Sequence, residues 1–237
     1  WSRELTTNDI ALGMVNPAMS EDDVVYVGTD RFMAFDSDGT PLWVYPNDQS
    51  YLPQCFSAPI IDPSGNIYFV AGDRVISLDA DGNERWAYVT DQPGNGLSSP
   101  AFTTDHSAII VCQYRTVYKF STTEGSIIWQ LPIDMDADIR SSPAVDDADN
   151  IYAASHGSGQ DNDQSTLYCI KHDGSSILWQ NNIGGDMYSS PALGDDRSIY
   201  IGSEGHNNVG NYNRLHALDM QPGDCRWSAQ LNMGVTW

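Results

Sequence analysis

Two histidines lie in the two longest polar segments of the sequence, each with carboxylates close by. His156 belongs to Ser155–Thr166 and His206 to Ser203–Arg214, and both segments are rich in Gly, Asn and Asp. The other candidate side chains in these segments are Asp161, Asp163, Glu204 and Tyr212. Imidazole and carboxylate groups bind transition metals, and polar loops often carry binding sites. We expect these residues to form a binding site, and the two histidines with a nearby carboxylate could also hold a metal. The alternative is that both segments are variable, solvated surface.

Three alternating aspartates form a second candidate site. Asp134, Asp136 and Asp138 are separated by single residues, and their carboxylate oxygens suit calcium. The segments Asp36–Gly39 and Asp79–Gly82 also resemble the start of a calcium loop. Neither opens a series with a glutamate twelve positions on, so both are predicted to be plain Asp-Gly turns.

No motif for catalysis is evident. The sequence has no nucleophile elbow, no P-loop and no dinucleotide fingerprint. The four cysteines include no adjacent pair and no C-x-x-C spacing. Cys112 and Cys169 are predicted to be small buried residues of strands. Cys55 and Cys225 fall at a loop and a turn, where either could join a disulfide that the sequence does not pair. Whether the protein is an enzyme stays open, and a noncatalytic role is favoured.

The charge balance narrows the class of partner. The chain of 237 residues has 32 acidic and 11 basic residues, for a net charge of −21. Phosphate backbones are bound through Lys and Arg, so nucleic acid and anionic membranes are unsuitable partners. No run of about 18 apolar residues predicts a membrane span. The first ten residues lack the pattern of a signal peptide, which indicates a cytosolic protein or a mature or excised piece.

The chain is built from repeats marked by tryptophan and proline. The tryptophans are Trp1, Trp43, Trp86, Trp129, Trp179 and Trp227, with gaps of 42, 43, 43, 50 and 48 residues. The prolines are Pro17, Pro59, Pro100, Pro143 and Pro191, with gaps of 42, 41, 43 and 48. Two independent markers that share one period define a repeat. The two long polar segments account for the longer gaps.

Each repeat predicts four short antiparallel strands. Apolar residues alternate at strand period, and Gly, Asp and Asn interrupt them every 8 to 12 residues. Four strands in 40 to 50 residues are typical of a β-propeller blade, so the fold class is an all-β propeller of four-stranded antiparallel blades. The predicted single domain covers residues 1–237, with repeats at about 6–48, 49–91, 92–134, 135–184 and 185–231. In this topology both long segments join second to third strands and lie on one face, which we call the loop face.

A tryptophan at the same place in each repeat is predicted to pack against the next blade rather than to form a stacking platform for a ligand. The segments around Trp43 and Trp227, Ala34–Trp43 and Ala217–Trp227, resemble the tryptophan-docking motif of PQQ-like propeller repeats. Ser141-Ser-Pro-Ala144 and Ser189-Ser-Pro-Ala192 match the usual opening of that repeat. The resemblance covers essentially the whole chain.

The resemblance implies a superfamily with several functions. It includes quinoprotein alcohol dehydrogenases, outer-membrane assembly lipoproteins and secreted or periplasmic binding propellers, so membership does not fix activity. The dehydrogenases typically carry an adjacent cysteine pair, a calcium site and a catalytic aspartate, and only the calcium site has a candidate here. No cofactor is therefore predicted; PQQ and calcium belong to the alternative of a dehydrogenase fragment.

The ends of the chain resemble incomplete repeats. Trp1–Leu5 matches Trp227–Leu231, and the last six residues match the start of another first strand. Five complete repeats therefore stand between two partial ones. We expect a piece of a longer propeller, with further blades from the rest of the chain; a closed five-blade ring is the alternative.

Taken together, the sequence predicts a noncatalytic, extracytoplasmic propeller, whether periplasmic, cell-surface or secreted. It would bind a protein or a polysaccharide at the loop face. The alternatives are a fragment of a PQQ-dependent alcohol or sugar dehydrogenase, and a structural module resembling outer-membrane assembly propellers.

Overall fold

A computed structural model shows five four-stranded antiparallel sheets that follow one another along the chain. It describes residues 16–231 except 49, 51, 54, 56, 92–97, 134–137, 157–164, 186 and 205–212. No helix occurs among these residues, and so none that could span a membrane. The prediction of an all-β propeller with four-stranded antiparallel blades is confirmed. We number the sheets as blades 1 to 5 in chain order.

Every blade has the same strand order. The short first strands are β1 (Ala18–Met19), β5 (Ile60–Ile61), β9 (Ala101–Phe102), β13 (Ala144–Val145) and β17 (Ala192–Leu193). The second strands are β2 (Val25–Gly28), β6 (Ile67–Ala71), β10 (Ala108–Gln113), β14 (Ile151–Ala154) and β18 (Ser198–Ser203). The third strands are β3 (Phe32–Phe35), β7 (Arg74–Leu78), β11 (Thr116–Ser121), β15 (Thr166–Ile170) and β19 (Asn213–Asp219). The fourth strands are β4 (Pro41–Tyr45), β8 (Glu84–Val89), β12 (Ile127–Pro132), β16 (Ile177–Asn182) and β20 (Cys225–Leu231).

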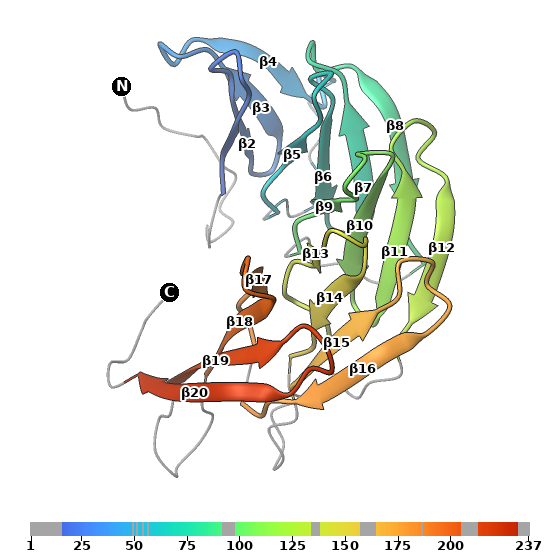
Figure 1. Cartoon of the computed structure of the whole chain (residues 1–237). Helices are drawn as coiled ribbons and strands as arrows, with labels where there is room; N and C mark the ends of the chain where they lie inside the picture. Colours follow the sequence, from blue (N-terminus) through green and yellow to red (C-terminus); the bar gives the residue numbers. More distant parts are fainter. Residues whose placement is uncertain are drawn as a thin grey trace.

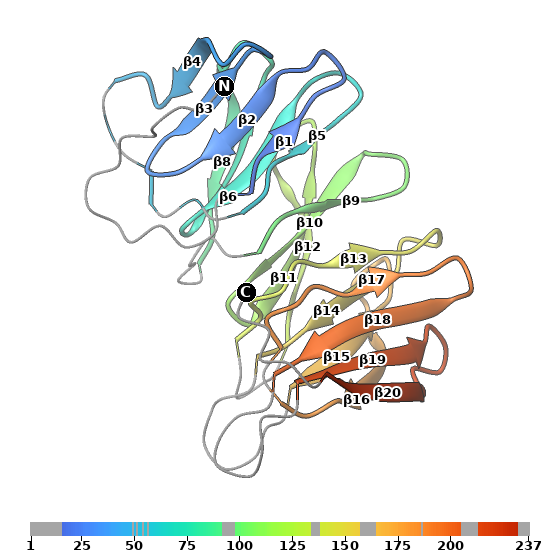
Figure 2. The ribbon, with the colours of Figure 1, turned by 90° about the vertical axis from the view of Figure 1, so that its left-hand side faces the viewer.

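The blades form an open arc (Figure 1). The fourth strands lie on the outside of the arc, and the first strands face its inside, as the turned view of Figure 2 shows. Each buried apolar cluster joins two successive blades: 1 with 2, 2 with 3, 3 with 4, and 4 with 5. Among the described residues none joins blade 5 to blade 1. A closed five-blade ring is therefore not what this part of the chain forms.

Burial explains the strand patterns. All five residues of β6 are buried, because a blade in the middle of the arc is covered on both faces. The outer strand β8 alternates between exposed and half-buried positions, as expected for an edge that faces solvent on one side. The second strands β6 and β10 are buried throughout, whereas the fourth strand β12 alternates between half-buried and exposed positions and β20 is exposed throughout.

Four tryptophans join neighbouring blades in one way. Each indole N–H donates to a backbone carbonyl of the next blade: Trp43 to Ala80 (2.9 Å), Trp86 to Thr122 (3.1 Å), Trp129 to His172 (3.2 Å) and Trp179 to Met220 (2.8 Å). Each ring also packs on a turn glycine with positive φ, namely Gly82, Gly125, Gly174 and Gly223. A register shift in the third strand of each blade lies opposite the start of the tryptophan strand. Trp227 follows the same shift, but it is 46% exposed and its ring contacts Tyr200 of its own blade.

The serines that precede the prolines link the connections between blades. Ala58 N donates to Ser99 Oγ (2.8 Å), Ser99 N to Ser142 Oγ (2.9 Å) and Ser142 N to Ser190 Oγ (2.9 Å). These bonds run from blade 2 to blade 5 and hold successive connections in register. Arg140 and Tyr188, which precede two of the Ser-Ser-Pro segments, hold equivalent positions in successive repeats.

The Asp-Gly turns have the predicted form. Asp36 Oδ1 accepts bonds from the backbone N–H groups of Asp38 and Thr40, at 3.0 and 2.8 Å. Asp79 Oδ1 accepts equivalent bonds from Asp81 and Asn83, at 3.0 and 2.9 Å. Because these carboxylates close the turns that bear them, the prediction of plain turns is confirmed.

Candidate functional site

The structure describes part of the predicted site. His156, Glu204 and Asp138 lie within the described residues. The other predicted residues lie outside them: Asp134, Asp136, Asp161, Asp163, His206 and Tyr212. Binding by these residues stays a prediction. Of the described three, His156 and Asp138 come together, since His156 N donates to the backbone oxygen of Asp138 (2.7 Å).

The segment around Ile139 crosses from blade 3 to blade 4. Ile139 forms isolated bridges with Tyr114, at the end of the β10–β11 hairpin, and with Ser155, just after β14. Its N–H donates to Tyr114 O at 2.6 Å, and its side chain is buried, with 2% exposed, in the core between these blades. Alternate residues of an extended segment point to opposite sides. Because the Ile139 side chain points into the core, the side chains of Asp138 and Arg140 point away from the core, toward solvent.

Asp138 lies between two arginines. Its Oδ1 is 3.8 Å from Arg115 Nε, and its Oδ2 is 3.9 Å from Arg140 Nη2. Calcium at Asp138 would meet two adjacent positive charges, which oppose a divalent cation. The part of this triad that the structure describes therefore favours an ion pair over a metal ligand.

Two tyrosines flank the arginines. The Arg115 guanidinium lies 5.0 Å from the ring centroid of Tyr114, and that of Arg140 lies 5.9 Å from the ring of Tyr188. The ring of His156 meets Tyr188 edge-on, with centroids 4.4 Å apart. Tyr188 is 49% exposed, so this group is open to solvent. We call it the Arg–Tyr cluster, which consists of Tyr114, Arg115, Asp138, Arg140, His156 and Tyr188.

Sequence reasoning found only part of this cluster. His156 and Asp138 were candidates. Arg140 and Tyr188 were missed, although each directly precedes a Ser-Ser-Pro segment. They occupy the same position in blades 4 and 5, and comparing the repeats at that position would have exposed them.

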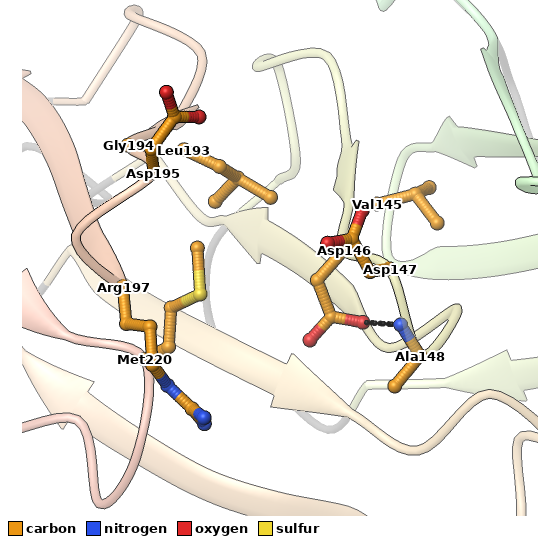
Figure 3. Close-up of a pocket in the computed structure, with 9 residues that line it drawn as sticks. All are labelled: Val145, Asp146, Asp147, Ala148, Leu193, Gly194, Asp195, Arg197 and Met220. Atoms are coloured by element: carbon orange, nitrogen blue, oxygen red, sulfur yellow. Dashed lines mark hydrogen bonds between the residues drawn. The ribbon is translucent and has the colours of Figure 1, made fainter.

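A cavity of about 350 Å³ lies on the opposite face, between blades 4 and 5. Figure 3 shows Leu193 and Met220 extending into the space between the two first-to-second turns. Between blades 3 and 4 the same turns are joined, because Asp149 Oδ1 accepts a bond from Thr104 N (2.8 Å). Arg197 holds the position of Asp149 in blade 5, and both have positive φ. A guanidinium has no acceptor, so it cannot make that bond.

The cavity does not bring together a catalytic set. Asp146, on its wall, accepts bonds from Ala148 N (2.9 Å) and Asn150 N (2.8 Å), so its carboxylate closes its own turn (Figure 3). No group of three His, Cys, Asp or Glu side chains that could hold a metal occurs in the described parts of the chain.

Three of the four cysteines are inert because they are buried. Cys55, Cys112 and Cys169 are buried free thiols, and Cys225 is an exposed one at the start of β20. The prediction for Cys112 and Cys169 is confirmed, and neither Cys55 nor Cys225 joins a disulfide. Burial raises the pKa of Cys55 and of Cys112 to about 12, and that of Cys169 to about 11. Thiolate is the reactive form, so these three are packing residues.

The repeated blades, their tryptophan contacts and the serine links define a PQQ-like repeat β-propeller. The chain belongs to the family described as outer membrane protein assembly factor BamB, which it matches over residues 1–232. None of the curated protein sequences compared with it is significantly similar.

Solved structures with similar folds have varied functions. BamB from Moraxella catarrhalis is 16% identical, with a TM-score of 0.66 over 89% of this chain and 62% of that one. A europium-containing methanol dehydrogenase is 12% identical, with a TM-score of 0.71 over 91% of this chain and 60% of that one. Kuenenia stuttgartiensis hydrazine synthase is 12% identical, with a TM-score of 0.72 over 97% of this chain and 69% of that one. This chain thus spans about three fifths of the first two structures, and the likeness shows the fold alone.

Proposed function

We propose that this chain is a noncatalytic, extracytoplasmic binding module that holds a partner protein at its loop face. The Arg–Tyr cluster is the observation that carries the proposal, because it gathers side chains from blades 3 and 4 and from the connection into blade 5 at one exposed place. Aromatic residues and arginine are the types enriched where proteins bind each other.

The family and the charge support this proposal. The family is described as an outer membrane protein assembly factor, a role that implies contacts with other proteins outside the cytoplasm. A net charge of −21 keeps such a module soluble and opposes non-specific binding to nucleic acid. A polysaccharide partner fits this charge less well if the sugar chain is itself acidic.

The principal alternative is a piece of a PQQ-dependent dehydrogenase, which the fold likeness to a methanol dehydrogenase favours. Such an enzyme needs a metal beside its quinone. The described residues offer no cluster of three metal-binding side chains, and Asp138 already pairs with two arginines. Asp134 and Asp136, the other candidate calcium ligands, lie outside the described residues, and an activity assay distinguishes this alternative.

The test is a comparison of two forms of the chain. The wild-type chain and a variant with residues 157–164 and 205–212 replaced by short Gly-Ser turns are immobilised and exposed to cell-envelope extract. Bound proteins are quantified by mass spectrometry. We expect at least one protein to be retained at least about tenfold more by the wild type, a difference of about 1.4 kcal/mol.

Two controls sharpen this test. Arg197→Gln changes one exposed guanidinium on the opposite face, and should leave retention unchanged. Equal retention by the wild type and the loop variant would contradict a loop-face module. Dye-linked oxidation of alcohols or sugars after addition of PQQ and calcium would instead establish the dehydrogenase.

A further inference from the structure

The two arginines of the Arg–Tyr cluster are poorly matched by the acceptors that the structure describes. Their contacts with Asp138 are 3.8 and 3.9 Å long, beyond hydrogen-bond distance. The Nε atoms of Arg115 and Arg140 are also shielded from solvent, without an acceptor among the described residues. A shielded donor without a partner costs free energy, and a charged one costs more. The rest of each guanidinium is within reach of a ligand, since the Arg115 and Arg140 side chains are 41% and 33% exposed, and the cluster can therefore bind an anion.

The local charge has the sign opposite to that of the whole protein. Arg115 and Arg140 contribute two positive charges and Asp138 one negative charge, so the three sum to +1, whereas the chain carries −21. Interactions between exposed charges are screened beyond about 8 Å at physiological ionic strength. A single anionic group at the cluster thus interacts mainly with the two arginines. A long polyanion would also meet the acidic surface around them.

The surroundings favour an anion that is attached to an apolar group. Tyr114 and Tyr188 stack beside the two guanidinium groups, and half of Tyr188 is open to solvent. An aromatic ring from a ligand can pack on such a surface with a gain beyond its buried area. The flat guanidinium fork also fits both oxygens of a carboxylate.

We propose that the Arg–Tyr cluster binds a carboxylate side chain of the partner protein, flanked there by aromatic residues. This inference rests on the proposed function and specifies the chemistry of its partner. The partner's carboxylate approaches from solvent and accepts hydrogen bonds from Arg140 and Arg115, beside Asp138. The flanking ring lies against Tyr188. Because only one carboxylate is recognised, the site selects a single acidic residue in an aromatic context over an acidic polymer.

The test uses two matched peptides and the full 237-residue chain. The first is the acetylated, amidated peptide glycine–tyrosine–glutamate–phenylalanine–glycine, and the second has glutamine in place of glutamate. Dissociation constants are measured by NMR titration. We expect the glutamate peptide to bind at least about tenfold more tightly, since charge-assisted bonds are roughly twice as strong as neutral ones. R140Q should remove this preference, and R140K should restore part of it because lysine keeps the charge but loses the fork.

The controls separate this inference from the proposed function. R197Q, a change of the same kind on the opposite face, should keep the preference. Equal binding of both peptides, or a preference that survives R140Q together with R115Q, would overturn the carboxylate site. The loop-face function would still stand if envelope proteins are retained by the wild type and lost from the loop variant. Tighter binding of an oligouronate than of the glutamate peptide would also overturn the inference, because it would identify an acidic sugar as the ligand.

Discussion

Among the residues that the structure describes, the tryptophan contact between blades occurs four times, whereas the Arg–Tyr cluster occurs once. In the repeated contact an indole N–H meets a backbone carbonyl and the ring covers a turn glycine, with distances that vary little from blade to blade. In the cluster the side chains differ at equivalent positions, as Arg140 and Tyr188 show. A contact that recurs between successive blades serves the packing of the blades. A position at which the repeats differ is a candidate for a function specific to one part of the molecule.

The two regions also differ in burial. The tryptophan contacts cover half-buried rings and backbone, where packing and hydrogen bonds stabilise the fold. The cluster lies at the surface, where ion pairs contribute little to folding. Substitutions should therefore affect stability in the first region and binding in the second.

The largest effect is expected at a turn glycine. Gly174 has φ of +69°, and an added Cβ would lie 2.5 Å from Trp129 Cδ2. Gly174→Ala should lower the free energy of unfolding by about 3 kcal/mol, as the sum of left-handed strain and overpacking. Gly65→Ala is the matched control: its φ is +81°, but the nearest atom to the new Cβ is 3.6 Å away, so about 1–2 kcal/mol is expected. Urea denaturation measures both, and equal losses would show that the ring contact is not tight.

A smaller effect is expected at the tryptophans, and it should depend on the blade. Trp179→Phe removes the 2.8 Å bond to Met220 O and part of a packed ring, so a loss of about 2 kcal/mol is expected. Trp227→Phe, where the ring is 46% exposed, should cost less than about 1 kcal/mol. Thermal and urea unfolding provide the measurement. A large loss at Trp227 would mean that its ring is covered in solution.

The repeated features could be predicted from the sequence because they recur from one blade to the next. The spacing of tryptophan and proline, the continuous apolar second strands and the Asp-Gly turns all pointed to one blade. Tertiary packing then agreed with local preference, as minimally frustrated sequences require. The open arc was harder to predict. It depends on which blades pack against each other, whereas the repeat pattern describes only the strands within one blade.

The site could be predicted only in part. Calcium binding by Asp134, Asp136 and Asp138 stays a prediction. The sequence did not show that Asp138 lies between two arginines, because one comes from residue 115, in blade 3, and the other from residue 140, beyond the alternating run. Arg140 and Tyr188 are far apart in sequence and meet only because successive blades place equivalent positions side by side. A motif within one short segment carries no information about such a pair. Aligning the repeats does, because it shows that the two residues hold equivalent positions in neighbouring blades.

The smallest effect on stability is expected inside the Arg–Tyr cluster. Arg140→Gln removes an ion pair of 3.9 Å whose side chains are 33% and 28% exposed, and Asp138 keeps its contact with Arg115. The free energy of unfolding should change by less than about 0.5 kcal/mol, because exposed pairs at this distance are weak and screened. Urea denaturation at low and high salt checks this, with Lys171→Gln as the control that removes the pair with Asp173 in a solvent-exposed turn. A loss above about 2 kcal/mol would assign Arg140 to the scaffold. A small loss of unfolding free energy would show that Arg140 does not stabilise the fold. The Arg–Tyr cluster would then differ from the tryptophan contacts in serving binding and not stability.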